Sequence, residues 1–493
     1  MDDRFGPDGV VADGAVLVEG NDIVEVGRYR DIKKQYPTAS VIGSRRFWVL
    51  PGFVNAHQHG KGLSNFQLGG VDESFELSRV KGPPQAKVPP YLDTLYAALR
   101  MIESGITTTF HYNASRGASF YESDVRERLR AYNDAGLRVT FGLDIRNRNH
   151  VVYGDDEFLT GLPEDLREKC RPRTTQSRTA DPETYFRLAQ RLDEQFKQAS
   201  DGRIKLFLAP AGPQWCTEDL LRAIRSFAEE RSLGIQIHAL ETKYQRAYFL
   251  RAYGKSAIAW LDELEFLSPR VGLAHGVWLS AEDIALAARR GCSVIHNPSS
   301  NLRLKSGIAP VTGFHAAGIS LALGLDSSAL NDDMDMLQEM RLCANLQRTP
   351  GVTAPTLPLK DILAAATASG SKILGWGSRC GPLEPGKAAD MILIDSERFR
   401  SPYLAPGQSP IDTLIYRSRA GDVDTVMIAG EILYQSKKHR KLDAKSILRQ
   451  LPVSIEPVGK TDPLDEELLP HVVRYYQTWD HEVLTPHHVV NNR

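Results

Sequence analysis

The chain has 493 residues, of which 42% are hydrophobic and 25% are charged, values that exclude a disordered or fibrous protein. Its formal net charge of -1 gives no overall field for nucleic acid or an anionic membrane, so we expect a small-molecule partner and neither of those. The length exceeds that of one ordinary domain and fits one large barrel with a smaller second domain.

Cysteine usage and the N-terminus bear on the cellular compartment. The five cysteines are scattered, form no C-x-x-C pair and are too few to stabilise a chain of this size through disulfide bonds, which favours a reducing cytoplasm. The N-terminus is acidic and Gly-rich, unlike a signal peptide, and no apolar run approaches the roughly 20 residues of a membrane helix. We therefore expect a cytoplasmic protein with no membrane insertion.

The two ends of the chain share a strand-like pattern. Residues 10–50 alternate polar and apolar positions between turn residues, and apolar runs return at 389–395 and 424–434. Neither end can bury a core alone, so we predict one small discontinuous β-sandwich domain from residues 1–50 and 376–450, followed by a C-terminal extension at 451–493. Met1-Asp2-Asp3 leads straight into a loop, which indicates a truncated or misassigned start of that sheet.

The central part, residues 51–375, alternates apolar strands with amphipathic helices, the order of a parallel sheet with helical crossovers. One of these helices is expected to begin with a capping box at Ser280 to Asp283. Eight strands are predicted, at residues 48–54, 107–111, 138–143, 204–208, 234–238, 271–274, 293–296 and 320–325. The prediction is an α/β fold, a (β/α)8 TIM-type barrel, whose active site lies where the strands end.

Polar residues gather at these strand ends. A single histidine beside an apolar run is usually a packed or surface residue, but clustering at the same end of most strands predicts a site. The residues are His57, His59, His111, Asp144, His238, His275, His296 and Asp326, with Gln214 further into its loop. Long connections after His59 and at 146–181 would overhang the barrel mouth, either as lids or as solvated insertions.

Four of these side chains suit a metal ion. His57 and His59 are separated by one residue, so both point to the same side of an extended strand. With His238 and Asp326 they offer three nitrogens and one oxygen, a set typical of zinc and its neighbours that leaves a position for water. Metal binding lowers the pKa of that water towards about 7 and makes hydroxide available at neutral pH.

Proton transfer requires further groups. Glu241 lies three residues after His238, where its carboxyl could take the proton of the water and deliver it to a leaving nitrogen. The alternative for Glu241 is an acidic residue favoured by the dipole at a helix N-terminus. His275 and Asp326 could orient the water or help to deprotonate it.

Six motifs follow one another in order along the chain. They are L-P-G-F-V-N-A-H-Q-H at 50–59, H-x-x-E at 238–241, A-H-G at 274–276, H-N-P-S-S-N at 296–301, G-L-D-S at 324–327 and L-E-P-G-K-A-A-D at 383–390. Together they resemble the amidohydrolase superfamily, and more narrowly its branch of mononuclear aminohydrolases. That branch covers triazine chlorohydrolases and guanine, cytosine and adenosyl-type deaminases. The resemblance runs from about residue 10 to residue 435.

The resemblance implies the same roles as the residues do. The metal ligands would be His57, His59, His238 and Asp326, with Glu241 as acid and base and His275 polarising water or substrate. Binuclear relatives carry a carboxylated lysine at the end of the fourth strand, where this chain reads A-P-A-G-P-Q-W at 209–215 and Lys205 lies too early. We therefore expect one divalent ion, Zn²⁺ as first choice and Fe²⁺ as the alternative. Relatives are often dimers or larger oligomers.

One departure from the family concerns the loop after the first strand. Many deaminases of this branch carry a Leu- and Trp-rich stretch there, whereas this chain reads G-K-G-L-S-N at 60–65. This loop normally shapes the substrate pocket, so hydrolytic deamination of a small cyclic or aromatic molecule stands first and amide, urea or carbamate hydrolysis second. A metal-binding scaffold without catalysis is a third reading, disfavoured because no ligand or acid–base residue is missing.

Further polar residues are candidates for the pocket wall. Each has an alternative in strand-end packing or in loop salt bridges. They are His111, Asp144, Gln214, Trp215, His296, Arg303 and Asp332. Asn297 and Asn301 are two further polar groups expected in the pocket.

Overall fold

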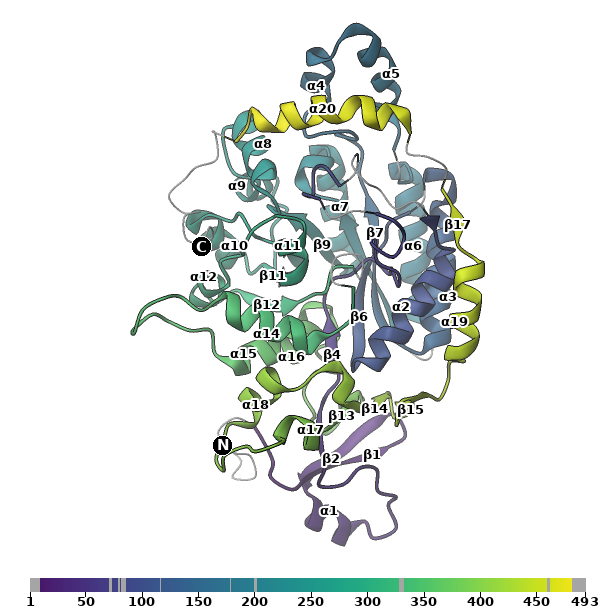
Figure 1. Ribbon diagram of the computed structural model, residues 1–493, viewed down its shortest axis with the longest axis vertical. Coiled ribbons are helices and arrows are strands. Elements are labelled where there is room, and N and C mark those ends of the chain that lie inside the picture. The colour runs from purple at the N-terminus through teal and green to yellow at the C-terminus, as the bar shows by residue number, and fades with distance from the viewer. Residues whose placement is uncertain are drawn as a thin grey trace.

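The computed structural model describes residues 9–70, 73–78, 80, 86–115, 117–177, 179–198, 202–327, 332–458 and 462–480. The expected start of the small sheet at 1–8 and the end of the extension at 481–493 lie outside these ranges. Figure 1 shows a central set of strands surrounded by helices, with a smaller sheet region at one end and helix α20 (Pro463–Gln477) across the other.

Eight parallel strands form the central sheet, and each pairs with the next along the chain. They are β4 (Phe53–Asn55), β6 (Ile106–Tyr112), β7 (Arg138–Ile145), β8 (Ile204–Pro210), β9 (Gly234–Ala239), β10 (Val271–His275), β11 (Ser293–His296) and β12 (Ser320–Leu323). The first and last strands meet where the Ala56 N–H donates to the Leu323 carbonyl at 2.8 Å and the Asp326 N–H to that of His57 at 2.9 Å. The predicted (β/α)8 barrel is confirmed.

Helices cover the outside of this barrel. They are α2 (Pro90–Glu103), α3 (Tyr121–Ala135), α6 (Pro182–Gln198), α7 (Glu218–Arg231), α8 (Lys243–Tyr253), α9 (Ala257–Glu263), α10 (Ala281–Arg289), α12 (Val311–Ala316), α14 (Met336–Leu346), α15 (Leu359–Ala365) and α16 (Ala368–Ile373). The short helix α11 (Pro298–Arg303) instead lies directly beyond the end of β11. Helix α10 begins with the capping box expected at Ser280, whose hydroxyl accepts from the Asp283 N–H while the Asp283 carboxylate accepts from the Ser280 N–H. Local sequence thus sets where this helix begins.

Both chain ends contribute to the smaller β region. A five-stranded antiparallel sheet has the order β16-β15-β14-β13-β3, and a separate hairpin joins β1 to β2. The strands are β1 (Gly14–Glu19), β2 (Asp22–Arg28), β3 (Phe47–Pro51), β13 (Met391–Asp395), β14 (Val423–Ile428), β15 (Glu431–Gln435) and β16 (Lys438–His439), with α1 (Tyr29–Gln35), α17 (Ser396–Arg400) and α18 (Pro410–Arg417) beside them. Because β3 pairs with β13, the expectation that both ends share a sheet is confirmed.

The run 48–54, predicted as one strand, is two strands. Its first part belongs to β3 of the small sheet and its second to β4 of the barrel, with Gly52 between them. A Cβ atom at Gly52 would lie 2.1 Å from the Thr107 hydroxyl oxygen, and the Gly52 N–H donates to the Asp390 carbonyl at 3.1 Å. The chain crosses from one sheet to the other at a point where only glycine fits, and an apolar pattern does not reveal that crossing.

The barrel has two distinct ends. At the start of β7, Arg138 forms a buried bidentate pair with Asp390 of the small-sheet region, at 2.8 and 3.0 Å. The chain beyond the end of β7 instead forms α4 (Asp155–Gly161) and α5 (Glu164–Thr175). Helix α20 lies beside α5 at this end of the barrel (Figure 1). The long connection at 146–181 thus contains two helices. The strand ends that carry the candidate residues face away from the small sheet.

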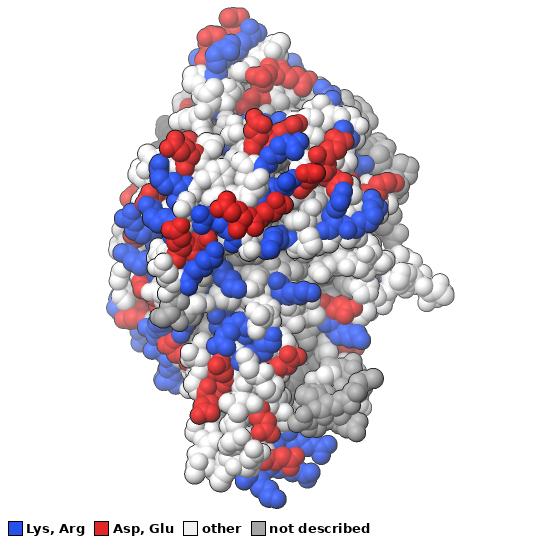
Figure 2. Space-filling model, turned by 180° about the vertical axis from the view of Figure 1, so that it is seen from behind, with Lys and Arg blue, Asp and Glu red and all other residues white. Residues whose placement is uncertain are grey.

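The surface carries both signs of charge. Figure 2 shows Lys and Arg interspersed with Asp and Glu over the face turned away from the viewer of Figure 1. This mixture agrees with the net charge of -1. Within the described part of the chain, no helix has the length and apolarity needed to cross a membrane.

Candidate metal centre

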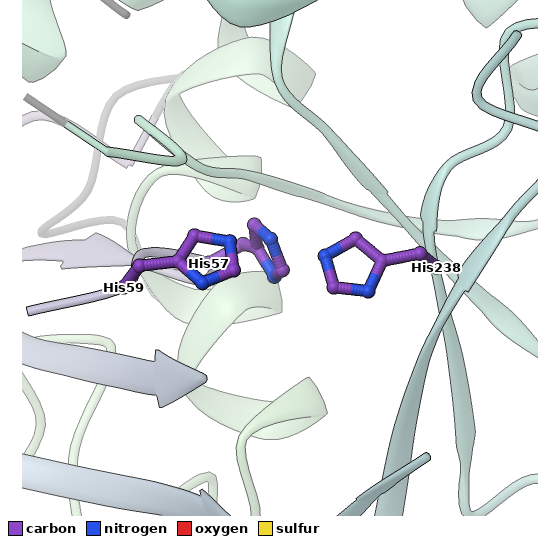
Figure 3. A group of neighbouring side chains, drawn as sticks. All are labelled: His57, His59 and His238. Atoms are coloured by element: carbon purple, nitrogen blue, oxygen red, sulfur yellow. The ribbon is translucent and has the colours of Figure 1, made fainter. Parts of the chain in front are cut away.

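Three histidines converge at the ends of the first and fifth strands of the barrel. His57 and His59 follow β4, and His238 lies in β9. Figure 3 shows their imidazole rings turned toward one another. One ring nitrogen of each lies within 4.8 Å of those of the other two, and the same holds for ligand atoms of His57, His275 and Asp326. His57 belongs to both groups, so all five side chains meet in one small volume.

Within the described chain, hydrogen bonds engage one of the two ring nitrogens of His57. Its Nδ1 lies 2.5 Å from Gln236 Oε1, and the other end of that amide donates to the Ala56 carbonyl at 3.0 Å. Gln236 Oε1 is therefore the acceptor and His57 Nδ1 the donor. Burial lowers the pKa of His57 to about 3, so the ring is neutral. Its Nε2 is buried and has no hydrogen-bond partner among the described residues, as a metal-binding nitrogen would.

His238 is oriented in a similar way by a backbone group. Its Nδ1 lies 2.9 Å from the carbonyl of Ala211, just beyond β8, and therefore donates its proton there. Burial, and then the nearby charge of His57, hold the pKa of His238 well below its ordinary value. A neutral ring that donates through Nδ1 presents the lone pair of Nε2 to the site.

Asp326 supplies the carboxylate of the group. Its Oδ1 lies 3.1 Å from His59 Nε2 and 3.9 Å from His57 Nε2, and its Oδ2 accepts a bond of 2.6 Å from the Ser300 hydroxyl. Burial favours the neutral acid, but the hydrogen bond and charge of His59 outweigh it and hold the pKa of Asp326 well below its usual range. The side chain is thus ionised. Its backbone has a φ of +60°, a left-handed conformation uncommon outside glycine.

Glu241 points into the same volume from just beyond β9. It is 1% exposed, and neither carboxyl oxygen has a hydrogen-bond partner among the described residues. Burial, followed by the charge of Asp326, raises its pKa well above the ordinary value. The N-cap of α8 is Thr242, so Glu241 precedes the helix and is not a first-turn residue. A buried carboxyl without a partner, beside ionisable groups, is typical of a functional group.

His275 completes the cluster. Its Nε2 lies 3.9 Å from Glu241 Oε2 and 4.0 Å from Asp326 Oδ2. Its Nδ1 lies 2.9 Å from Asn301 Oδ1, which fixes the proton on Nδ1 because an amide oxygen only accepts. Its backbone φ is +74°, again left-handed for a residue other than glycine, and such strained positions cluster at functional sites.

Helix α11 forms hydrogen bonds to two of the clustered side chains. Ser300 bonds Asp326 and Asn301 bonds His275. Two residues of the motif at 296–301 therefore orient Asp326 and His275 through hydrogen bonds. Asn301, a candidate for the pocket wall, is a buried hydrogen-bond partner of His275. Sequence reasoning overlooked Ser300 and Gln236. Gln236 had a usable signal, because it lies two residues before His238 and faces the same side of its strand.

The remaining candidates have several kinds of surroundings. His111 is buried, stacks on Phe141 with ring centres 4.7 Å apart, and bonds the Tyr132 hydroxyl at 2.9 Å. Asp144 accepts from Asn113 at 2.8 Å, and burial raises its pKa to about 7. The structure also buries Gln214, Trp215, His296 and Asn297. Arg303 and Asp332 pair with each other at 2.9 Å, the loop salt bridge foreseen as their alternative.

The donor set fits a divalent metal. Three imidazoles and one carboxylate supply the nitrogen and oxygen ligands that zinc and related ions prefer. The carboxylate is ionised, and the Nδ1 atoms of His57 and His238 are engaged elsewhere, so the second nitrogen of each ring is available.

Comparison with known proteins then decides the family. The model of the amidohydrolase family matches residues 48–433. The chain belongs to the amidohydrolase family. This confirms the resemblance inferred from the six motifs, and it accounts for the barrel and for the histidine-rich centre at its strand ends.

Curated relatives of this amidohydrolase are similar over nearly their whole length. The 5'-deoxyadenosine deaminase of Methanothermobacter thermautotrophicus is 31% identical over 447 residues, which cover 89% of this chain and 93% of the relative. The 5-methylthioadenosine/S-adenosylhomocysteine deaminase of Syntrophobacter fumaroxidans is 30% identical over 455 residues, which cover 91% and 93%.

Solved structures agree with the fold. An adenosine deaminase from Xanthomonas campestris with bound zinc superposes with a TM-score of 0.75 at 25% identity, over 90% of this chain and 93% of the other. An atrazine chlorohydrolase from Arthrobacter aurescens, complexed with zinc, has a TM-score of 0.75 at 22% identity and 92% and 97% coverage. The latter likeness shows the fold alone.

Proposed function

We propose that this amidohydrolase deaminates an amino-substituted aromatic heterocycle by hydrolysis, with adenine nucleosides altered at the 5' position as the first substrates to test. The protein is a hydrolase of C–N bonds other than peptide bonds, as its relatives are. The observation that carries the proposal is the buried carboxyl of Glu241, which has no hydrogen-bond partner among the described residues and lies beside His275 and near the charge of Asp326. The relatives named as deaminases of 5'-deoxyadenosine and methylthioadenosine support the choice of substrate.

The metal assignment is part of the same proposal. His57, His59, His238 and Asp326 would hold one divalent ion, with zinc favoured by the zinc present in the related structures. When bound, such an ion lowers the pKa of a water and so supplies a nucleophile near neutral pH. Gln236 orients the ring of His57, the Ala211 carbonyl orients the ring of His238, and Ser300 orients the ionised carboxylate of Asp326.

The protein's own groups would move the protons. In deamination the attacking water loses a proton and its oxygen bonds to the ring carbon, the C–N bond breaks, and the departing amino group gains that proton to leave as ammonia. Glu241 is suited to carry that proton, because burial and the charge of Asp326 raise its pKa and its carboxyl oxygens have no competing partner in the described chain. His275 donates through Nδ1 to Asn301, so its Nε2 is an acceptor that would orient the water.

The loop that begins at Gly60 supports a second candidate function, the hydrolysis of an amide, urea or carbamate. Its sequence departs from that of many deaminases, and part of it is fixed over the barrel, where the Phe75 N–H donates to the Leu304 carbonyl at 3.1 Å and Glu73 pairs with Lys305 at 2.9 Å. Amide, urea or carbamate hydrolysis would use the same water and the same acid, and would differ only in the leaving group that this loop admits.

A substrate panel separates the two candidates. The purified chain, loaded with zinc, is assayed for ammonia release from 5'-deoxyadenosine, 5'-methylthioadenosine, adenosine, guanine, cytosine and aminotriazines. A parallel set of anilides, ureas and carbamates is assayed for amine release. Ammonia from a heterocycle supports deamination. Amine release from the second set alone would replace deamination by the second candidate, and no zinc-dependent turnover on either set would contradict both.

The compartment is also proposed. All five cysteines are free and buried, which supports a reducing cytoplasm.

A further inference from the structure

Helix α20 crosses the end of the barrel that carries the site (Figure 1). Asp462 caps it by accepting from the Leu464 N–H at 3.0 Å, and Pro463 occupies its first turn. Its buried residues Leu468, Val472 and Tyr476 recur every four positions, so one face packs against the protein. Within the C-terminal extension, α20 is therefore a docked element of the fold.

The docked face holds the backbone of one residue, Tyr153, from both sides. The Tyr475 hydroxyl donates to the Tyr153 carbonyl at 2.8 Å, and the Tyr153 N–H donates to the Tyr476 hydroxyl at 3.2 Å. The rings of Tyr153 and Tyr476 also meet edge to face, with centres 5.7 Å apart. Tyr153 lies in the connection that follows β7 and is itself buried. Without α20, both of its backbone groups lose these partners.

Tyr153 in turn connects to the residue after Glu241. Its hydroxyl donates to Glu76 Oε1 at 3.3 Å, and the same oxygen accepts from the hydroxyl of Thr242. Glu76 is buried, which raises the pKa of its carboxyl to about 7. Such a group is costly to bury unless its hydrogen bonds are made, so Tyr153 and Thr242 hold it firmly in place.

Thr242 also fixes the start of α8. Its hydroxyl oxygen caps the helix by accepting from the Gln245 N–H, while Gln245 Oε1 accepts from the Glu241 N–H at 2.8 Å. A second tie reaches the same turn, because Asp480 beyond α20 accepts from Lys243 at 2.5 Å and from the Tyr244 hydroxyl at 2.9 Å. The segment that carries Glu241 is thus connected to the C-terminal extension by two routes.

We propose that α20 supports the active site. Its residues Tyr475 and Tyr476 act as positioning residues for Glu241. They hold Tyr153, which with Thr242 holds Glu76, and this buried group fixes the first turn of α8 and the carboxyl just before it. The inference rests on the proposed role of Glu241 in proton transfer. Proton transfer is sensitive to displacement of the acid, and a shift of about 1 Å can cost about 100-fold in rate.

A matched control exists on the same helix. Glu467 pairs with Lys169 of α5 at 2.8 Å, and both side chains are substantially exposed. Glu467→Gln removes a tie of α20 to the protein without touching Tyr153. It is expected to leave turnover unchanged.

The test compares full-length, zinc-loaded wild type, Tyr475→Phe/Tyr476→Phe and Glu467→Gln. Each tyrosine substitution keeps the packed ring and removes only the hydroxyl. For the double variant we expect kcat on the best substrate of the panel to fall by about tenfold or more, with KM and zinc content within about twofold of wild type. Hydrogen–deuterium exchange over residues 239–253 should be faster than in wild type and in the Glu467→Gln control.

A second variant keeps the inference testable if the double variant is poorly folded. Tyr153→Phe removes the hydroxyl that reaches Glu76 and leaves the backbone bonds to α20, and its kcat should fall in the same direction. A kcat unchanged in both variants, a rise in KM alone, or loss of zinc would overturn the inference.

Failure of the proposed function has a different signature. If the wild type turns over no member of the panel, the proposed role of Glu241 fails, but the exchange measurement still decides whether α20 holds this segment. Equal exchange over 239–253 in all three proteins would overturn the coupling itself.

Discussion

His57 Nδ1 lies 2.5 Å from Gln236 Oε1, and the same amide donates to the Ala56 carbonyl next to His57 in the chain. One glutamine therefore holds both the ring of this histidine and the backbone before it. The bond decides which nitrogen of His57 carries the proton, and so leaves Nε2 available to a metal.

Replacing Gln236 by leucine should weaken zinc binding by about 10- to 100-fold, because the ring of His57 loses the acceptor that fixes its tautomer. The dissociation constant is measured by competition with a chromophoric chelator. Gln236→Glu, which keeps an acceptor, serves as the control, and His57→Ala marks complete loss of the ligand. Wild-type affinity in the leucine variant would show that the amide does not orient the ring.

Glu241→Gln should retain zinc and lose turnover by about 100- to 10,000-fold, since the amide has the shape of the acid but cannot carry the proton. Steady-state kinetics and metal analysis are done on the same preparation. The proposed ligands are untouched by this change, so a variant without zinc would point to a structural role for Glu241. Turnover close to wild type would remove it from the mechanism.

The stability of the fold should depend on pH through Glu339. This residue of α14 is fully buried, and burial raises the pKa of its carboxyl to about 8, although it accepts from the Ser299 N–H at 3.3 Å. The folded protein holds the proton more tightly than the unfolded chain, so stability is greatest below the ordinary pKa of a glutamate and is lost as pH rises toward 8. Glu339→Gln removes this pH-dependent contribution to the stability of the fold.

Thermal midpoints of wild type and Glu339→Gln at several pH values between 4.5 and 8.5 test the prediction. The midpoint of the variant relative to wild type should rise steadily with pH across this window. A constant difference between the two proteins would mean that Glu339 does not titrate with the raised pKa.

Breaking the pair between Arg138 and Asp390 should destabilise the protein by about 3–5 kcal/mol, because either single change leaves a buried charge uncompensated. Both side chains are 3% exposed, and the Arg138 guanidinium also lies over the Trp376 ring, 4.9 Å from its centre. Asp390 Oδ1 accepts from the Ala429 N–H at 2.7 Å as well, so its loss also frees a backbone donor.

Urea unfolding of Arg138→Met, Asp390→Asn and the double variant measures the effect. We expect the double variant to be more stable than the sum of the single changes predicts, since it removes both charges together. Zinc content should be unaffected because the pair lies at the opposite end of β7 from the site. Single variants as stable as wild type would show that the pair contributes little.

Local pattern alone was enough for much of the fold. Alternating strands and helices predict the barrel, the spacing of His57 and His59 places both rings on one side of a strand, and Ser280 sets the start of a helix. Each of these depends on residues a few positions apart, where backbone geometry is fixed by the period of the element. The motifs around His238, Glu241 and Asp326 also gave the family.

Only the tertiary structure decided how the site is held. The crossing at Gly52, the bond from Gln236 to His57 and that from Ser300 to Asp326 depend on which strands and helices become neighbours. Helix α20 reaches Tyr153 across more than 300 residues of chain. The sequence by itself determined the candidate site residues and the strand ends that carry them. Packing between distant segments determined their orientation, because a hydrogen bond between remote residues leaves no periodic trace in the sequence.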